Sequence, residues 1–164
     1  MEIRILHEDL LRFHADAIVN PSNTHGFMGG GIAEDIKKEG GQDIEMEAAE
    51  QSPIPIGTAV LTQSGKLRCE HIIHAPTMEQ PEGETSLDYI KEATQAALEC
   101  AEEHKIANVA MPGLGSGKIP KEDAAKAMIE AIVNFDAEHV TSLTLIDEDI
   151  EMVKAWHKIY SGKV

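Results

Sequence analysis

With 164 residues, 42% of them hydrophobic, the chain is long enough for one packed domain and too apolar to be disordered throughout. Its 14 basic and 29 acidic residues give a net charge of −15, and Lys37-Lys38 is the only adjacent basic pair, so we expect neither nucleic acid nor a membrane as a partner. Met1–Leu11 lacks the pattern of a secretion signal, and Cys69 and Cys100 do not make a disulfide framework, which favours one cytoplasmic domain spanning residues 1–164.

Short strands and helices alternate along the first half of the chain. The alternation of apolar residues predicts strands over Met1–Leu6, Asp16–Asn20, Thr58–Thr62 and Glu70–Ala75. The second of these strands is expected to stop at Pro21, and a turn is expected at Ser64-Gly65. Helices are predicted over Ile32–Glu39 and Gln42–Gln51, with Gly40-Gly41 between them.

The second half continues this alternation after a polar surface loop at Met78–Gly83. Helices are predicted over Ser86–His104, Lys121–Phe135 and Glu148–Tyr160, and strands over Ile106–Met111 and Val140–Ile146. The order of these elements indicates an α/β fold with a mostly parallel sheet covered on both faces. Ligands of such sheets bind at the carboxyl ends of the strands.

Two segments place a glycine-rich turn between an apolar strand and a helix. One runs from Ala17–Asn20 to Gly29–Gly31, and the other from Val109–Met111 to Gly113–Gly117. Glycine lets the backbone approach a ligand, and the next helix start offers free N–H groups, so each segment is suited to hold a phosphate without basic side chains. Alternatively, the glycines only make tight turns. Neither segment fits the Walker or the dinucleotide-binding pattern.

Together with other motifs in the same order, these segments resemble the macro domain family, which binds ADP-ribose and includes the Appr-1-p processing type. The matching motifs are Glu8–Leu10, Asp16–Asn23, Gly29–Ala33, Pro55–Thr62, His71–Pro76 and Ala110–Gly117. The resemblance covers nearly the whole chain. It implies a three-layer α/β/α sandwich with a mixed, mostly parallel six-stranded sheet.

The resemblance also implies roles for individual residues. Asp9 would accept a hydrogen bond from the adenine amino group beside the Leu10 backbone, although Asp9 also fits a helix-start cap. Asn23, next to Ser22, would face the distal ribose as the catalytic residue; the alternative is an Asx-turn before the glycine segment, and the two roles are compatible. The remaining ligand-binding residues would be Gly29, Gly30, Gly31, Ile32, Gly115, Ser116, Gly117, Lys118 and Ile119 at the diphosphate and Ile146 at the adenine.

Some positions depart from the family. Ile119 and Ile146 stand where many members carry an aromatic residue, so we expect the pocket to clamp its ligand with aliphatic groups. Ala33 stands where a hydrolytic subgroup carries aspartate, and the nearest candidate bases are His25 and Glu34. The resemblance implies no metal and no cofactor.

Three functions therefore stay open. The first is binding of ADP-ribose or an ADP-ribosylated protein. The second is slow hydrolysis of ADP-ribosyl esters, whether mono-ADP-ribosyl-protein, O-acetyl-ADP-ribose or ADP-ribose 1″-phosphate, the last a phosphatase reaction. The third is an acidic scaffold without a ligand.

Other residues favour structural roles. Cys69, His71 and His74 resemble a metal-binding spacing, but on a strand His74 points away from the other two, which argues against zinc. Trp156 is expected to be a packing anchor. The acidic run Asp147–Asp149 is expected to stabilise the start of the last helix.

Overall fold

The computed structural model describes residues 1–81, 83–115 and 117–162. Six strands form one sheet: β1 (Glu2–His7), β2 (Ala17–Asn23), β3 (Val60–Gln63), β4 (His71–Met78), β5 (Asn108–Met111) and β6 (Ser142–Asp147). Their order in the sheet is β1-β6-β5-β2-β4-β3. Strand β3 runs antiparallel to β4, and the other pairs are parallel, as the sequence predicted for a mixed, mostly parallel sheet.

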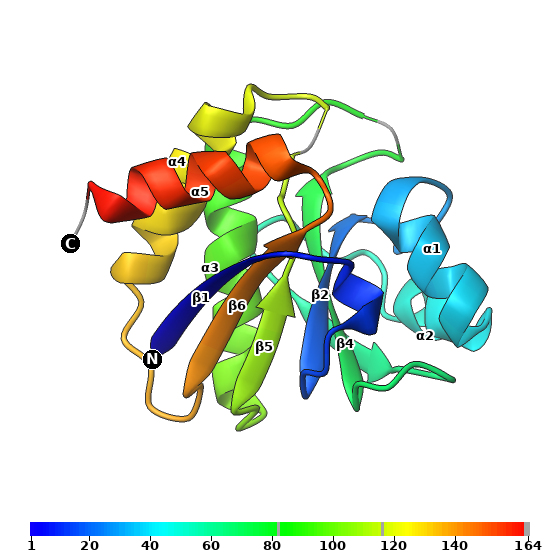
Figure 1. Ribbon diagram of the computed structural model, residues 1–164. Helices are drawn as coiled ribbons and strands as arrows, with labels where there is room; N and C mark the ends of the chain where they lie inside the picture. Colours follow the sequence, from blue (N-terminus) through cyan, green and yellow to red (C-terminus); the bar gives the residue numbers. More distant parts are fainter. Residues whose placement is uncertain (82, 116, 163–164) are drawn as a thin grey trace.

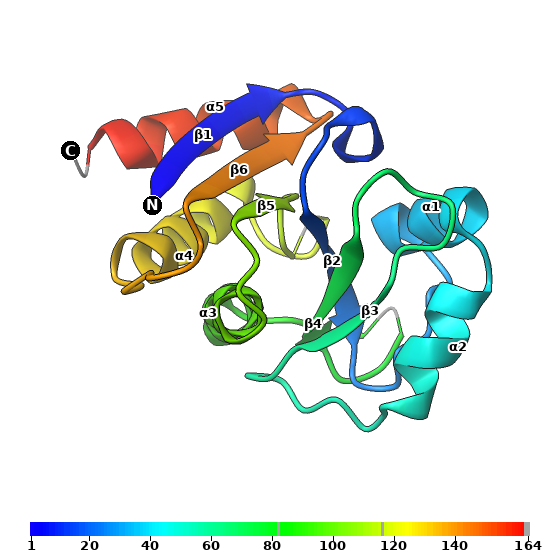
Figure 2. The same cartoon turned by 90° about the horizontal axis from the view of Figure 1, so that it is seen from below.

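Helices cover both faces of this sheet (Figures 1 and 2). They are the short 3-10 helix η1 (Leu10–Arg12), α1 (Gly31–Gly40), α2 (Asp43–Glu50), α3 (Leu87–Glu103), α4 (Lys121–Val133) and α5 (Ile150–Ser161). Helices α1 and α2 lie against one face, and α3, α4 and α5 pack on one another against the other. The predicted three-layer α/β/α sandwich is confirmed.

The core lies in two clusters, one on each face of the sheet. The predicted stripe of small residues on α3 is buried: Ala93, Ala96, Ala97 and Cys100. The predicted face of α4 is buried as well: Ala124, Ala127, Met128, Ala131 and Ile132. Trp156 is fully buried in the same cluster, which confirms it as a packing anchor. The second cluster lies under α1 and η1 and includes Leu10, Ile36 and Ile146.

Strand β2 does not stop at Pro21, contrary to the prediction, but continues to Asn23. It pairs with β5 only at Ala17 and Ile18 among the described pairs, whereas its pairing with β4 continues past Pro21. A proline lacks the N–H that a two-sided strand needs. Because β2 has one partner at this point, the proline is tolerated and the strand extends to the cleft.

A bulge interrupts the pairing of β2 with β4 at the same end. Ser22 pairs with Pro76, and the next residue, Asn23, pairs with Met78, so Thr77 is the extra residue. Bulges bend a strand and redirect a side chain, and they are common beside functional sites. Here the bulge lies where the strands end at the cleft described below.

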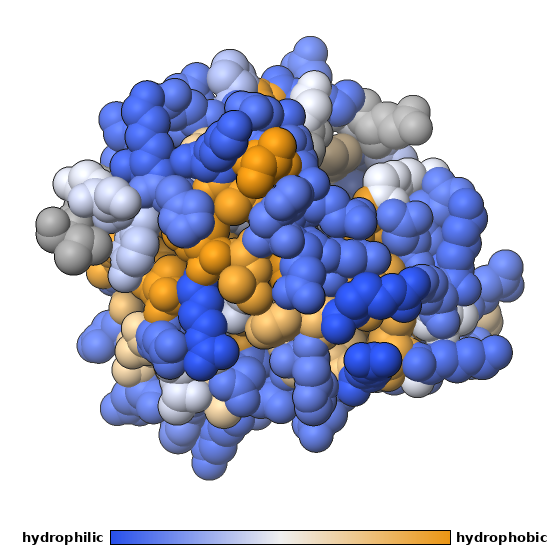
Figure 3. Space-filling view, viewed as in Figure 1, coloured by the Kyte–Doolittle hydropathy of each residue, from blue (hydrophilic) through white to orange (hydrophobic). Residues whose placement is uncertain are grey.

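The face of the molecule shown in Figure 3 is mostly hydrophilic, and apolar side chains show between the hydrophilic ones. Among the large hydrophobic residues that the structure describes as exposed, Phe27 is the aromatic one, and 51% of its surface is accessible. Among the described helices, none has the length and apolar character to cross a bilayer.

Candidate functional site

Two adjoining cavities lie at the carboxyl ends of the parallel strands. The inner cavity, of about 420 Å³, is lined by residues that include Asp9, Ile32, Thr77, Gly115 and Ile146. The outer cavity, of about 580 Å³, is lined by residues that include Ser22, Asn23, Phe27, Gly29 and Lys118. Both are lined by Pro21, Gly30, Gly31, Ala33 and Met78, so they form one cleft.

The start of α1 lies between the two cavities. Gly30 occupies the N-cap position in an extended conformation without a side-chain cap, and Gly31 has a φ of 60°, which glycine adopts without strain. The first hydrogen bond of the helix runs from the Glu34 N–H to the Gly30 carbonyl at 3.4 Å. The N–H groups of Gly31, Ile32 and Ala33 precede it, so the positive end of the helix dipole lies at the cleft.

The second glycine segment lies along the cavities in part, and its predicted contact with the diphosphate stays a prediction. Gly115 has a φ of 72° and lines the inner cavity, but its carbonyl accepts the N–H groups of Lys118 at 3.1 Å and Ile119 at 3.2 Å. Those two N–H groups therefore close a turn. Gly117 is exposed, and Ile119 packs against the core; as far as the described residues show, neither lines the cavities. Ser116 lies outside the described residues.

Asp9 stands at the end of the inner cavity that contains Leu10 and Ile146. Its Oδ1 accepts the Leu11 N–H at 2.9 Å and caps η1, so the helix-cap interpretation is confirmed. Its Oδ2 lies 3.8 Å from Arg12 Nε. Ile146 is fully buried and supplies an apolar wall. That Asp9 binds adenine stays a prediction.

Asp147 has a role that the sequence did not reveal. The prediction of a helix-start carboxylate is confirmed for Asp149, which accepts the Glu151 N–H at 3.0 Å and caps α5. Asp147 instead accepts the Gly113 N–H on Oδ2 at 3.0 Å and the Asp149 N–H on Oδ1 at 2.9 Å. It thereby ties the segment after β5 to the end of β6.

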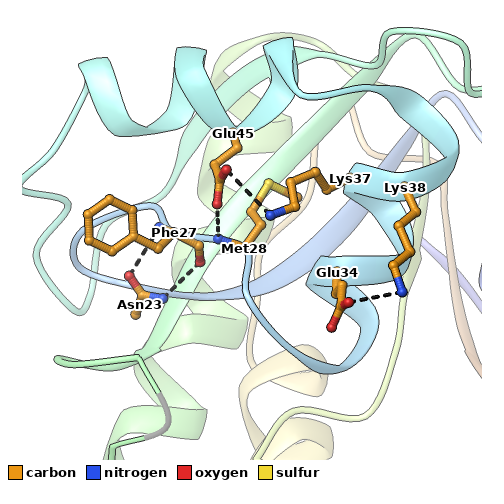
Figure 4. Close-up of polar contacts among 7 residues, drawn as sticks. All are labelled: Asn23, Phe27, Met28, Glu34, Lys37, Lys38 and Glu45. Atoms are coloured by element: carbon orange, nitrogen blue, oxygen red, sulfur yellow. Dashed lines mark hydrogen bonds and ion pairs between the residues drawn. The ribbon is translucent and has the colours of Figure 1, made fainter.

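Asn23 holds the loop that borders the outer cavity (Figure 4). Its Oδ1 accepts the N–H groups of His25 at 3.0 Å and Phe27 at 3.3 Å, and its Nδ2 donates to the Phe27 carbonyl at 2.9 Å. The Asx-turn interpretation is therefore confirmed. The amide fixes the backbone of Phe27 on both sides.

The expectation of a purely aliphatic pocket is wrong, because Phe27 lines the outer cavity. Its ring stacks on His25 with centroids 5.6 Å apart and an interplanar angle of 13°. His25 Nε2 lies 3.1 Å from Gln80 Oε1. The aromatic ring comes from the loop after β2, whereas the sequence comparison with the family looked for it at Ile119 and Ile146.

Glu45 on α2 supports this loop, and neither Glu45 nor Glu34 on α1 lines the two cavities. Glu45 accepts the Met28 N–H at 2.6 Å and lies 3.5 Å from Lys37 Nζ (Figure 4). Glu34 pairs with Lys38 at 2.9 Å, and this neighbour lowers the pKa of the Glu34 carboxyl. A carboxyl with a lowered pKa is a weak general base near neutral pH. His25 and Glu34 are thus engaged outside the cavities.

His74 belongs to a buried network and not to a metal site. Its Nε2 lies 2.8 Å from Thr62 Oγ1, and its Nδ1 lies 3.0 Å from Asn20 Nδ2. Burial lowers the pKa of His74 from 6.5 to about 4 and raises the pKa of the Cys69 thiol to about 11. Within the part of the chain that the structure describes, no group of three potential ligands could hold a metal ion.

The fold is that of known macrodomains. A variant of the Oceanobacillus iheyensis macrodomain solved with ADPR superposes with a TM-score of 0.85 at 17% identity, covering 97% of this chain and 91% of that one. The Trypanosoma brucei macrodomain in complex with ADP-ribose also has a TM-score of 0.85, at 19% identity, covering 97% of this chain and 69% of that one. These similarities establish the fold.

Sequence comparison identifies the family. A protein of Aquifex aeolicus is 47% identical over 161 residues, which cover 97% of this chain and 98% of that protein. A protein of Aeropyrum pernix is 46% identical over 109 residues, covering 66% of this chain and 58% of that protein. A Mycobacterium tuberculosis protein is 37% identical over 134 residues, covering 80% of this chain but 37% of that protein. The sequence model of the macro domain matches residues 19–128, and the chain belongs to the macro domain family.

Proposed function

We propose that the chain binds ADP-ribose and related ADP-ribosyl metabolites in the cleft formed by the inner and outer cavities. The observation that carries this proposal is the start of α1, where the N–H groups of Gly31, Ile32 and Ala33 precede the helix ladder between the two cavities. Backbone donors at a helix N-terminus bind phosphates without basic side chains. This suits a chain of net charge −15.

The ligand extends across both cavities in this proposal. The adenine lies against Ile146 beside Asp9, and the diphosphate lies at the start of α1. The distal ribose lies in the outer cavity near Asn23 and Phe27. The macrodomain of Trypanosoma brucei was solved with ADP-ribose, and that of Oceanobacillus iheyensis with ADP, which supports a ligand of this class. We expect micromolar affinity, about −8 kcal/mol.

A second function, slow hydrolysis of ADP-ribosyl esters, is favoured by the position of Asn23 in the outer cavity. The described residues lining that cavity include Lys118 but no carboxylate and no histidine. General-base help, typically about 10²–10⁴-fold, is then missing from the protein side. Positioning of the ribose and stabilisation of charge by the α1 amides would remain. ADP-ribosylated protein is the substrate we propose for this reaction.

The test is calorimetric titration with ADP-ribose, followed by single-turnover release of ADP-ribose from a mono-ADP-ribosylated protein. Asn23→Ala is expected to remove most of any release and to leave much of the affinity. Because Asn23 also holds Phe27, the control is Phe27→Ala, which removes the ring and keeps the Asn23 amide. If wild type shows no heat with ADP-ribose at millimolar concentration, the binding proposal is wrong. If Phe27→Ala abolishes release as fully as Asn23→Ala, the Asn23 amide acts by positioning the Phe27 ring and not by a contact of its own with the substrate.

A further inference from the structure

Thr77 carries a buried hydroxyl without a hydrogen-bond partner. The residue is 1% exposed, and its Oγ1 has no partner among the described residues. Two other buried threonines contrast with it: Thr94 Oγ1 donates to the Ile90 carbonyl at 2.8 Å, and Thr62 Oγ1 donates to the Gln63 carbonyl at 3.0 Å. An unsatisfied buried polar group is unfavourable, and one that persists in a folded protein calls for an explanation.

The backbone places Thr77 in the wall of the cleft. Thr77 is the extra residue of the bulge between β2 and β4, and it lines the inner cavity. The start of α1, at Gly30 and Gly31, and the turn at Gly115 line the same cavity. The bulge thus places a residue with an unpartnered hydroxyl in the wall of the cavity that the backbone donors of α1 also border.

We infer that the Thr77 hydroxyl donates a hydrogen bond to a diphosphate oxygen of the bound ligand, and so makes the site select a diphosphate over a monophosphate. This inference rests on the proposed function. A hydroxyl can supply a hydrogen to an anionic oxygen, and hydrogen bonds to charged groups are the stronger ones. The partner that the hydroxyl lacks within the protein is then supplied by the ligand.

Such a role predicts opposite effects on stability and on binding. Thr77→Val replaces the hydroxyl by a methyl group of similar size and removes an unsatisfied donor from the interior. Removing such a group does not lower stability, whereas removing one partner of a made hydrogen bond does. A hydroxyl with a purely structural role would behave in the reverse manner, lowering stability and leaving affinity unchanged.

The experiment compares wild type, Thr77→Val, Thr77→Ser and Thr94→Val by thermal unfolding and by calorimetric titration with ADP-ribose, ADP and AMP. For Thr77→Val we expect unchanged or higher Tm and about tenfold weaker binding of ADP-ribose and ADP, a difference of about 1.4 kcal/mol. AMP binding is expected to change little. Thr77→Ser keeps the donor and should keep most of the affinity. Thr94→Val is expected to lower Tm with affinity unchanged.

Three results would overturn the inference. If Thr77→Val binds ADP-ribose and ADP with wild-type affinity, the hydroxyl does not contact the ligand. If the variant loses affinity for ADP-ribose but not for ADP, the hydroxyl contacts the distal ribose and not the diphosphate. An equal loss for AMP means that Thr77 does not discriminate diphosphates. If wild type binds neither ADP-ribose nor ADP, the proposed function itself is wrong, a result distinguishable from the other three because it needs no variant.

Discussion

At the scale of single residues, His74 connects three neighbouring strands inside the sheet. It lies on β4 and contacts Asn20 on β2 and Thr62 on β3. Because the amide Nδ2 of Asn20 can only donate, the His74 Nδ1 accepts, and the proton of the neutral ring lies on Nε2 facing Thr62. Protonation of Nδ1 would put two donors face to face in a dry environment. The native state therefore requires a neutral ring.

This requirement predicts how stability depends on pH. The pKa of His74 is about 4 in the folded protein against the ordinary 6.5, so below pH 6.5 the unfolded chain binds a proton that the folded chain excludes. The free energy of unfolding should be highest above pH 6.5 and fall towards pH 4 by roughly 3 kcal/mol. Urea unfolding at a series of pH values between 7.5 and 4 measures this change in the free energy of unfolding. In His74→Gln this part of the pH dependence should vanish; an unchanged slope would exclude His74 as its source.

Asp9 combines a structural contact with a proposed ligand contact, and one substitution separates the two. Asp9→Asn keeps a side-chain oxygen for the Leu11 N–H, since asparagine caps as well as aspartate. It replaces the other oxygen by a donor, which cannot accept from adenine. We expect affinity for ADP-ribose to fall tenfold or more, consistent with about 1.5–3 kcal/mol for a hydrogen bond to a charged group. Ribose 5-phosphate, which lacks adenine, is the control ligand; an equal loss for both would contradict adenine recognition.

At the scale of elements, the loop between β2 and α1 presents an aromatic ring at the mouth of the outer cavity. Asn23 fixes the Phe27 backbone, and Glu45 on α2 accepts the next N–H, that of Met28. The ring is 51% exposed despite these restraints, and it stacks on His25. A loop held this firmly presents a rigid platform, which lowers the entropy lost when a ligand stacks on it.

Removing the platform should affect only ligands that reach the outer cavity. Phe27→Ala is expected to weaken ADP-ribose by about two- to tenfold, since aromatic stacking contributes roughly 0.5–1.5 kcal/mol. ADP, which ends at the diphosphate, should bind as to wild type. The matched control is Met46→Ala, which truncates a side chain 60% exposed on α2. The measurement is calorimetric titration of each variant with ADP and with ADP-ribose. Equally weaker binding of both ligands would argue against the proposed placement of the distal ribose.

At the scale of the whole molecule, the order of elements and the layers followed from the sequence, but parts of the cleft did not. The alternation of strands with amphipathic helices determined the sandwich, and the glycines before α1 indicated the cleft. Phe27 could not be found in this way, because its place depends on three hydrogen bonds to a single amide, that of Asn23. Thr77 could not be found either, since a bulge is a property of two paired strands. The role of Asp147 could not be predicted either, because it depends on a hydrogen bond with Gly113, 34 positions earlier in the chain.

The overall charge predicts an unusual salt dependence. The chain carries −15, and the inner cavity is lined by four carboxylates, those of Asp9, Asp35, Asp147 and Glu148. An anionic ligand is repelled by these groups, and salt screens repulsion between charges about 10 Å apart or more. We expect ADP-ribose to bind several-fold more tightly when salt rises from about 0.02 to 0.3 M. Titrations at both concentrations measure this. Weaker binding at high salt would show that cations such as Lys118 dominate.

Strand β1 has β6 as its neighbour in the sheet, and Glu2 pairs with Ser142, 140 positions further along the chain. During synthesis, β1 leaves the ribosome before β6 and cannot form its native pairing until β6 has been made. Until then its backbone groups and the side chains of Ile3 and Ile5 lack their native neighbours. Contacts between such distant segments slow folding. The β1–β6 half of the sheet, which borders the proposed adenine end of the cleft, is therefore completed only after the β6 segment has been translated.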